Sequence, residues 1–161
     1  MEARQVSFMP GTPYTGANLR IKAPRGAGGR GALIAWDVAA GKLVWTIEES
    51  LPIESRVLAT AGGIVFYGTL DGWFKAADAR SGKLLWQFHA ASGIIGQPVS
   101  IQRADGRQYI AVLAGIGGAA GAVAQQDIDI RDATAARGYA NAIRDLPPVA
   151  TGGMLYVFAL P

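Results

Sequence analysis

The sequence predicts an all-β protein: a partial β-propeller of about two and a half blades, with one short helix in a C-terminal insert. Three observations lead to this fold class. The 161 residues suffice for one domain, and 22 Gly and 8 Pro favour short strands and many turns over a helix bundle. A segment of the chain recurs 41 residues further on. The stretches between turns are apolar and alternate in the manner of strands.

The repeat is the strongest sign of a propeller. AWDVAAGKLVW at Ala35–Trp45 returns as AADARSGKLLW at Ala76–Trp86, with Ala, Asp, Gly, Lys, Leu and Trp at the same places. In each copy an apolar strand ends at an Asp that can bond its own turn, and a Gly supplies the positive φ of a tight connection. A second strand then carries a Trp as its large packing residue. Each copy is therefore a predicted β-hairpin, and propeller blades recur every 40 to 45 residues or so.

The elements follow in order along the chain. Residues 1–30 are predicted to be an irregular loop rich in Gly and Pro, and residues 31–161 an incomplete propeller sector. The sector opens with the hairpin that contains Leu33, the remainder of a first blade. A complete second blade of about 57–88 has predicted strands at 57–60, 63–69, 73–77 and 83–88. A third blade of about 94–160 has three predicted strands, at 94–101, 108–115 and 152–160.

An insert at 117–150 interrupts the third blade. Asp132 is a predicted N-cap for the helix ATAARGYANAIRDL, which Pro147 and Pro148 stop. The fourth strand of this blade is missing, and a propeller needs at least four blades to close. We therefore expect a sector with two uncovered sides. Burial is expected to centre on Trp45, Phe66, Trp86, Ile110, Val112, Tyr156 and Phe158.

Composition excludes several classes of protein. A net charge of +3 without a basic run argues against nucleic-acid binding. The absence of Cys excludes disulfides and thiolate metal sites. No apolar stretch reaches the roughly 18 residues of a membrane span. The start, MEARQVSFMPGTPY, has no apolar region typical of a secretory signal, so we expect the chain, made alone, to stay in the cytoplasm.

Several motifs have ordinary structural explanations. Gly26, Gly28 and Gly31 match G-x-G-x-x-G, but a strand and not a helix follows, so no helix N-terminus is present to hold a pyrophosphate. His89 is the only histidine, which excludes a triad or a His-rich metal cluster and favours a structural role. Two acidic pairs could bind a hard cation, although loop solvation explains them better: Glu48 with Glu49, and Asp127 with Asp129.

The repeated A-x-D-x-x-x-G-K-x-x-W resembles the tryptophan-docking motif of quinoprotein alcohol dehydrogenases. Further segments resemble the C-terminal part of the methanol and ethanol dehydrogenase large subunit, nearest the lanthanide-dependent methanol dehydrogenases. They include GTPYTGAN, LATAGGIVFYGTLDGWFKAADARSGKLLWQF, SGIIGQPVSI, GRQYIAVLAGIGG and GGMLYVFALP. The resemblance covers nearly the whole chain and is specific in order and spacing.

This resemblance implies an eight-bladed propeller that holds pyrroloquinoline quinone (PQQ) and a Ca²⁺ or lanthanide ion in the periplasm. Such enzymes oxidise primary alcohols, with an Asp as base and a metal that polarises the quinone, and electrons leave to a cytochrome c. The family's metal ligands, catalytic Asp and vicinal disulfide belong to portions that nothing in this sequence matches. The resemblance therefore assigns no catalytic and no metal-binding residue to this chain.

Three positions correspond to cofactor contacts of the family. Glu54 stands where relatives usually carry a Trp near the quinone; Gly118 matches the pattern, and Ala119 again stands where a Trp is usual. Losing an aromatic wall removes contact worth on the order of 1 kcal/mol per ring. Glu54 adds a carboxylate beside a cofactor rich in carboxylates, which is repulsive unless a cation intervenes.

Two hypotheses about function follow. In the first, the chain is the C-terminal propeller fragment of a PQQ-dependent alcohol dehydrogenase, inactive and free of cofactor when alone, whose partner is the missing N-terminal propeller portion. In the second, it is a non-enzymatic propeller scaffold that pairs with another protein through its uncovered edges.

Overall fold

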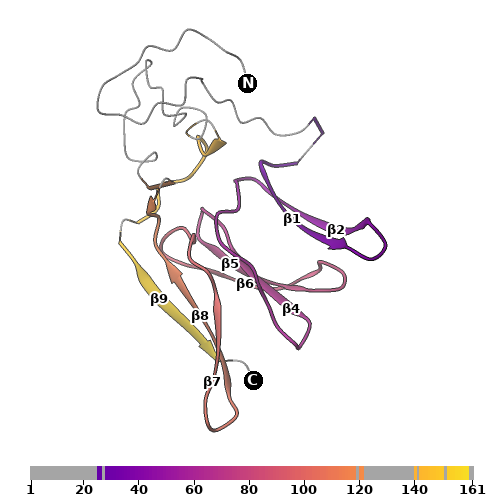
Figure 1. Cartoon of the computed structure of the whole chain (residues 1–161). Helices are drawn as coiled ribbons and strands as arrows, with labels where there is room; N and C mark the ends of the chain where they lie inside the picture. The colour runs from indigo at the N-terminus through magenta and orange to yellow at the C-terminus, as the bar shows by residue number, and fades with distance from the viewer. Residues whose placement is uncertain are drawn as a thin grey trace, which may run out of the picture.

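The computed structural model describes residues 25–26, 28–118, 120–121, 140, 142–150 and 152–159, which form three antiparallel sheets (Figure 1). The first sheet pairs β1 (Gly31–Asp37) with β2 (Lys42–Glu49). The second has the order β3 (Leu58–Ala59), β4 (Ile64–Gly68), β5 (Trp73–Asp78) and β6 (Leu84–His89). The third contains β7 (Val99–Gln102), β8 (Gln108–Ala114) and β9 (Met154–Ala159).

This arrangement confirms the predicted partial β-propeller. Sheets of two, four and three strands follow one another along the chain, and each strand pairs antiparallel with its sequence neighbour. The helix predicted at 133–146 falls largely outside the described residues, of which only Ala140 and Ala142 have helical backbone there. The predicted loop at 1–30 also lies mostly outside them.

The two copies of the repeat fold in the same way. Asp37 Oδ1 accepts a hydrogen bond from the Ala40 amide at 2.9 Å, and Asp78 Oδ1 accepts from the Ser81 amide at 2.7 Å. The turn glycines have a positive φ of 62° at Gly41 and 71° at Gly82. Both hairpins also contain a register shift in the strand before the turn. The local turn chemistry of the sequence therefore suffices to specify both hairpins.

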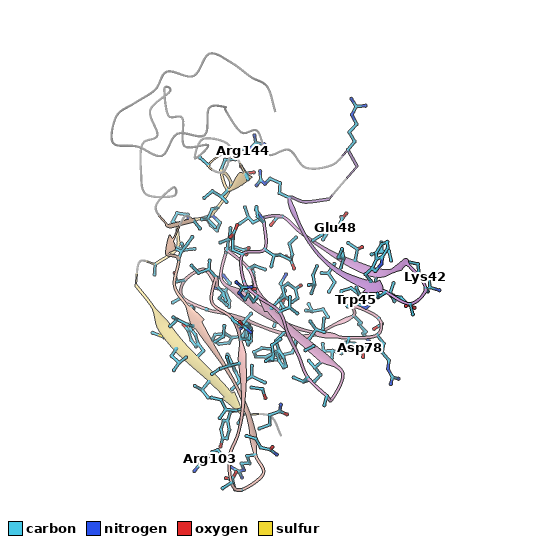
Figure 2. All side chains as sticks on the ribbon, in the orientation of Figure 1. Lys42, Trp45, Glu48, Asp78, Arg103 and Arg144 are labelled. Atoms are coloured by element: carbon cyan, nitrogen blue, oxygen red, sulfur yellow. The ribbon has the colours of Figure 1, made fainter. Side chains whose placement is uncertain are left out.

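Trp45 joins the first sheet to the second. Its indole N–H donates to the Ala79 carbonyl oxygen at 3.0 Å. Its ring lies so close to Gly82 that a Cβ placed on this glycine would be 2.8 Å from it. Trp45 and Asp78 lie beside one another where the two hairpins meet (Figure 2). A Gly at position 82 thus serves both the turn and the contact between blades.

The main core lies between the second and third sheets. Phe66, Ile110 and Val112 are buried, as predicted, whereas Tyr156 and Phe158 are half-buried against the same cluster. Three phenylalanines stack through this core: the Phe74 ring centroid lies 5.8 Å from that of Phe66 and 5.6 Å from that of Phe158. Aromatic rings of the second and third sheets therefore pack against one another within this core.

The prediction that Trp86 is buried is wrong, because 41% of its surface is exposed. Trp45, which is half-buried, has the turn of the next blade over its ring. In the described part of the chain, no equivalent turn follows β9 to cover Trp86. Trp86 instead borders a cavity of about 550 Å³ between the second and third sheets, which Phe74 and Phe158 also line.

We expect Gly82→Ala to destabilise the protein more than Gly41→Ala. Both substitutions force a left-handed conformation on a residue with a Cβ, which costs about 1 kcal/mol. Only at Gly82 does the new methyl group also displace the Trp45 ring, at an expected further cost of about 1 to 3 kcal/mol. The measurement is the free energy of unfolding in urea. Equal losses for the two variants would contradict the role given to this contact.

Candidate functional site

One end of the strands carries the three long connections and one short turn. The segments 50–57, 69–72, 90–98 and the described parts of 115–153 leave the strands at this end, which we call the connection end. The hairpin turns, such as those that follow Asp37 and Asp78, lie at the opposite end. In Figure 1 the connection end is where β8 ends and β9 begins. The predicted cofactor positions all belong to segments at the connection end.

A second hydrophobic cluster binds these connections into one layer. Leu51 comes from the segment after β2, Leu70 from the turn after β4, and Ile116 from the segment after β8. Ala120 and Ile143 complete the buried set, and Ile95, Leu146 and Val149 pack on it. The segments that hold Glu54 and Gly118 are therefore brought together by their buried neighbours.

Glu54 is exposed, next to a buried anchor. The hydroxyl group of Ser55 donates to the Gly68 carbonyl oxygen at 2.9 Å and accepts from the Gly68 amide at 2.8 Å. Ser55 thus satisfies both backbone groups of the last residue of β4. Position 54 is consequently held at the surface of the connection end.

Gly118 is also exposed, with a φ of 55°. A Cβ at this position would meet nothing within 4 Å. Ala119, the third predicted position, lies outside the described residues. The structure therefore places Glu54 and Gly118 at the same end of the sector, and both residues are exposed.

Glu49 occupies a different environment from the one expected. Its carboxylate accepts hydrogen bonds from the Lys75 ammonium group at 2.7 and 2.9 Å, and from the Tyr67 hydroxyl group at 2.7 Å. The interpretation of Glu49 as a solvated loop residue is therefore wrong. Burial, and then the neighbouring Glu49 carboxylate, raise the pKa of Tyr67, so the phenol keeps the proton that it donates. Glu48 points to the other side of the strand and accepts from the Gly28 amide at 3.0 Å.

An ion pair links the start of β1 to the insert. A guanidinium nitrogen of Arg30 lies 2.7 Å from Asp145 Oδ2, and Arg144 approaches the same oxygen at 3.6 Å. The hydrogen bond from Arg30 and the charge of both arginines lower the pKa of Asp145. Sequence analysis missed this pair because its members are 115 residues apart.

The remaining candidates have structural roles or lie outside the described residues. His89 Nε2 is 2.9 Å from the Asp71 carbonyl oxygen, and its ring meets Trp73 edge to face. Strand β1 begins at Gly31, so the glycine motif leads into a strand as expected. Asp127 and Asp129 lie outside the described residues.

Two features are absent from the described residues. No group of three or more His, Cys, Asp and Glu side chains among them could hold a metal ion. Among the same residues there is no helix long and apolar enough to cross a membrane.

A fan of antiparallel sheets, with a repeated hairpin whose tryptophan docks on the next turn, defines a β-propeller protein of the tryptophan-docking class. The PQQ_2 family model, described as "Outer membrane protein assembly factor BamB", matches residues 7–159. The chain belongs to this family.

Its similarity to curated proteins is to quinoprotein alcohol dehydrogenases. The chain is 43% identical over 99% of its length to a lanthanide-dependent methanol dehydrogenase of Methylacidiphilum fumariolicum, of which it covers 27%. It is also 43% identical over 98% of its length to a quinoprotein ethanol dehydrogenase of Pseudomonas aeruginosa, of which it covers 22%. The chain therefore spans about a quarter of the length of these relatives.

A solved structure shows the same architecture. The europium-containing methanol dehydrogenase superposes with a TM-score of 0.68 and 46% identity, over 80% of this chain and 23% of that one. This similarity agrees with the resemblance drawn from the tryptophan-docking motif.

We expect Ser55→Ala to lower the free energy of unfolding by about 1 to 3 kcal/mol, since it leaves the Gly68 amide and carbonyl buried without a partner. The matched control is Ser100→Ala, which removes an exposed hydroxyl group that accepts from Gln108 at 2.7 Å. This change should cost less than about 0.5 kcal/mol. Urea unfolding compares the two variants, and similar losses would contradict the anchoring role of Ser55.

The Arg30–Asp145 pair should stabilise the fold only while Asp145 is ionised. Because the pKa of Asp145 is lower in the folded protein than its ordinary 3.8, the contribution is present at neutral pH and is lost as the pH falls through the lowered value. NMR titration of the Asp145 carboxyl carbon should give a midpoint below 3.8 that rises in Arg30→Gln. Arg144→Gln should raise it less, because Arg144 is further from the carboxylate. A midpoint insensitive to Arg30→Gln would contradict this assignment.

Proposed function

We propose that this chain is the C-terminal propeller sector of a PQQ-dependent alcohol dehydrogenase, and that it is inactive and binds no cofactor when alone. The observation that carries the proposal is the 43% identity to a lanthanide-dependent methanol dehydrogenase over 99% of the chain. In this proposal the rest of the propeller supplies the catalytic base and the ligands for Ca²⁺ or a lanthanide. The assembled enzyme oxidises primary alcohols in the periplasm.

Apolar surface on both outer sides of the sector supports a place within a larger propeller. On the first sheet, Ile34 and Trp36 are each 56% exposed. On the third sheet, Leu155 is 63% exposed and Val157 54%. Surfaces of this kind are typical of interfaces in soluble proteins. In the proposal, further blades cover both sides.

The described residues fit the quinone only as part of a wall. Glu54 is exposed, and the space next to Gly118 is open. An anionic quinone requires cationic partners and a metal ion in addition, and the described residues contain no group of three or more metal ligands. In the proposal the rest of the propeller supplies these groups, and we derive no step of alcohol oxidation from the described residues.

Names of relatives indicate where the electrons go. One relative, 37% identical over 99% of this chain, is a "Methanol dehydrogenase [cytochrome c] subunit 1" of Paracoccus denitrificans. By analogy, a cytochrome c is the proposed electron acceptor of the assembled enzyme.

A non-enzymatic scaffold is the second candidate. The description of the matching family model as an outer membrane protein assembly factor favours it, as do Glu54 and Ala119 at positions where the dehydrogenases usually carry Trp. In this case the uncovered sides of the sector bind a protein that has no quinone site.

Reconstitution tests the proposal. The chain is mixed with PQQ and either Ca²⁺ or La³⁺, and then with the remaining propeller portion of a lanthanide-dependent methanol dehydrogenase, expressed separately. We expect neither quinone binding nor dye-linked alcohol oxidation by the chain alone, and both in the mixture. Turnover by the chain alone would refute the proposed incompetence. A mixture that associates without binding PQQ would favour the scaffold.

In the reconstituted mixture, Glu54→Trp should tighten PQQ binding about fivefold to tenfold, because it restores an aromatic wall and removes a carboxylate next to an anion. Quinone fluorescence or calorimetry measures the affinity. The control is Glu48→Gln, which removes an exposed carboxylate from β2 and should leave the affinity unchanged. Unchanged or weaker binding of PQQ by Glu54→Trp would show that position 54 does not border the cofactor.

A further inference from the structure

A buried cluster of three side chains joins the first two sheets at the connection end. Glu49 is the last residue of β2, whereas Tyr67 and Lys75 are directly opposite one another on β4 and β5. Both oxygens of Glu49 accept from the Lys75 ammonium group, at 2.7 and 2.9 Å, and one also accepts from the Tyr67 hydroxyl group at 2.7 Å. The Lys75 nitrogen lies 6.0 Å from the centroid of the Tyr67 ring. The first sheet thus contributes one carboxylate, which two side chains of the second sheet bind.

This cluster is shielded from water. Tyr67 is fully buried, and the side chains of Glu49 and Lys75 are only 11% and 15% exposed. An ion pair in such a place gains little net stability, because desolvation offsets the attraction between the charges. The best-attested use of a buried pair is to fix one geometry over its alternatives. The cluster is therefore better suited to positioning than to stabilisation.

The segment held by the cluster is the connection that carries Glu54. Glu49 is attached to Tyr67 immediately before this connection, and Ser55 is attached to Gly68 near its end. Tyr67 and Gly68 are neighbours on β4, so both ends of the connection are attached to the same end of this strand. Leu51, buried between the two anchors, adds an apolar contact. Glu54 thus lies on a short loop that is hydrogen-bonded to β4 near both of its ends.

The junction between the second and third sheets lacks such an anchor. A shift of 41 residues along the repeat places Ala90 where Glu49 stands. Ala90 is buried in the main core, and its amide donates to the Gly72 carbonyl oxygen at 2.8 Å. Neutral groups bond the neighbouring segments there instead: the Gly115 amide donates to the Gly93 carbonyl oxygen at 2.7 Å, and the Ser92 hydroxyl group donates to the Ala150 carbonyl oxygen at 2.7 Å. Of the two junctions between the described sheets, only the one next to the connection that contains Glu54 therefore has this ionic anchor.

A metal site is a poor alternative explanation for this cluster. Glu49 contributes a single carboxylate, and the Lys75 ammonium group already lies against both of its oxygens. A divalent cation would have to displace this buried positive charge. The positioning role is the one that the contacts support.

We propose that Glu49 is a positioning residue: with Lys75 and Tyr67 it fixes the connection 50–57 on the second sheet and thereby sets where the side chain at position 54 lies. The assignment of position 54 to the cofactor wall rests on the proposed function; the anchor itself does not.

The test uses the whole chain without PQQ. Because the chain has no cysteine, Glu54→Cys provides a single thiol for a nitroxide label, whose mobility reports on position 54. In this background Glu49→Gln is compared with Glu48→Gln, the neighbouring change on the opposite side of β2. Hydrogen exchange of the amides in 50–57 is measured in parallel on the same substitutions without the label.

We expect Glu49→Gln to increase the label mobility and to accelerate exchange in 50–57 by about fivefold or more, the effect of losing a charged hydrogen bond. Exchange in β7, β8 and β9 should remain unchanged, as should all readings in Glu48→Gln. Unchanged mobility in Glu49→Gln, or faster exchange spread evenly over the three sheets, would overturn the proposal.

Tyr67→Phe keeps the experiment decisive if Glu49→Gln fails to fold. It removes one hydroxyl group and leaves the ion pair, so we expect a smaller increase in exchange, about twofold to threefold, confined to the same segment. No local change in Tyr67→Phe would also refute the proposal. None of these measurements involves PQQ. A failed reconstitution would therefore contradict only the proposed function, and unchanged mobility and exchange would contradict only the role of Glu49.

Discussion

The packing of a tryptophan from one blade on the glycine turn of the next is the contact on which the rest of the structure depends. A sheet of two to four strands has two faces and cannot bury both by itself. In this chain the Trp45 ring rests on Gly82 and its indole N–H reaches the Ala79 carbonyl oxygen, so one contact supplies apolar burial and a directional hydrogen bond. This contact joins the hairpin-turn ends of the first two sheets.

Contacts between neighbouring sheets make the connection end a continuous layer. Leu51, Leu70 and Ile116 can share one cluster only because the three sheets that carry their segments are held side by side. A site built on such a layer draws its groups from several blades. A sector with three sheets therefore contributes only some of the groups of such a site. This agrees with a chain that spans about a quarter of the length of its relatives.

Structural features that depend on residues adjacent in sequence could be predicted from the sequence. Features that depend on contacts between distant segments could not. The Asp37 and Asp78 turns are encoded within a few residues, so both hairpins were predictable. The exposure of Trp86 depends on an element that should cover it, which its own neighbourhood does not reveal. The burial of Glu49 did leave a signal: strand alternation puts it on the same face as Trp45, toward the second sheet. Glu54, Gly118 and Ala119 were found only through resemblance to a family, because nothing about them is unusual locally.

The docking contact also has a direction. Trp45 points to a turn that comes later in the chain, at Gly82. Of the two tryptophans of the repeated motif, Trp86 therefore has no such turn over it in the described residues, and of the two motif turns, the one at Gly41 has no tryptophan against it. The two outer sides of the sector therefore differ: one presents a tryptophan, and the other presents the glycine turn that such a tryptophan contacts. Because the tryptophan and the glycine turn are different partners, a contact of this kind orders two neighbouring blades in one direction only.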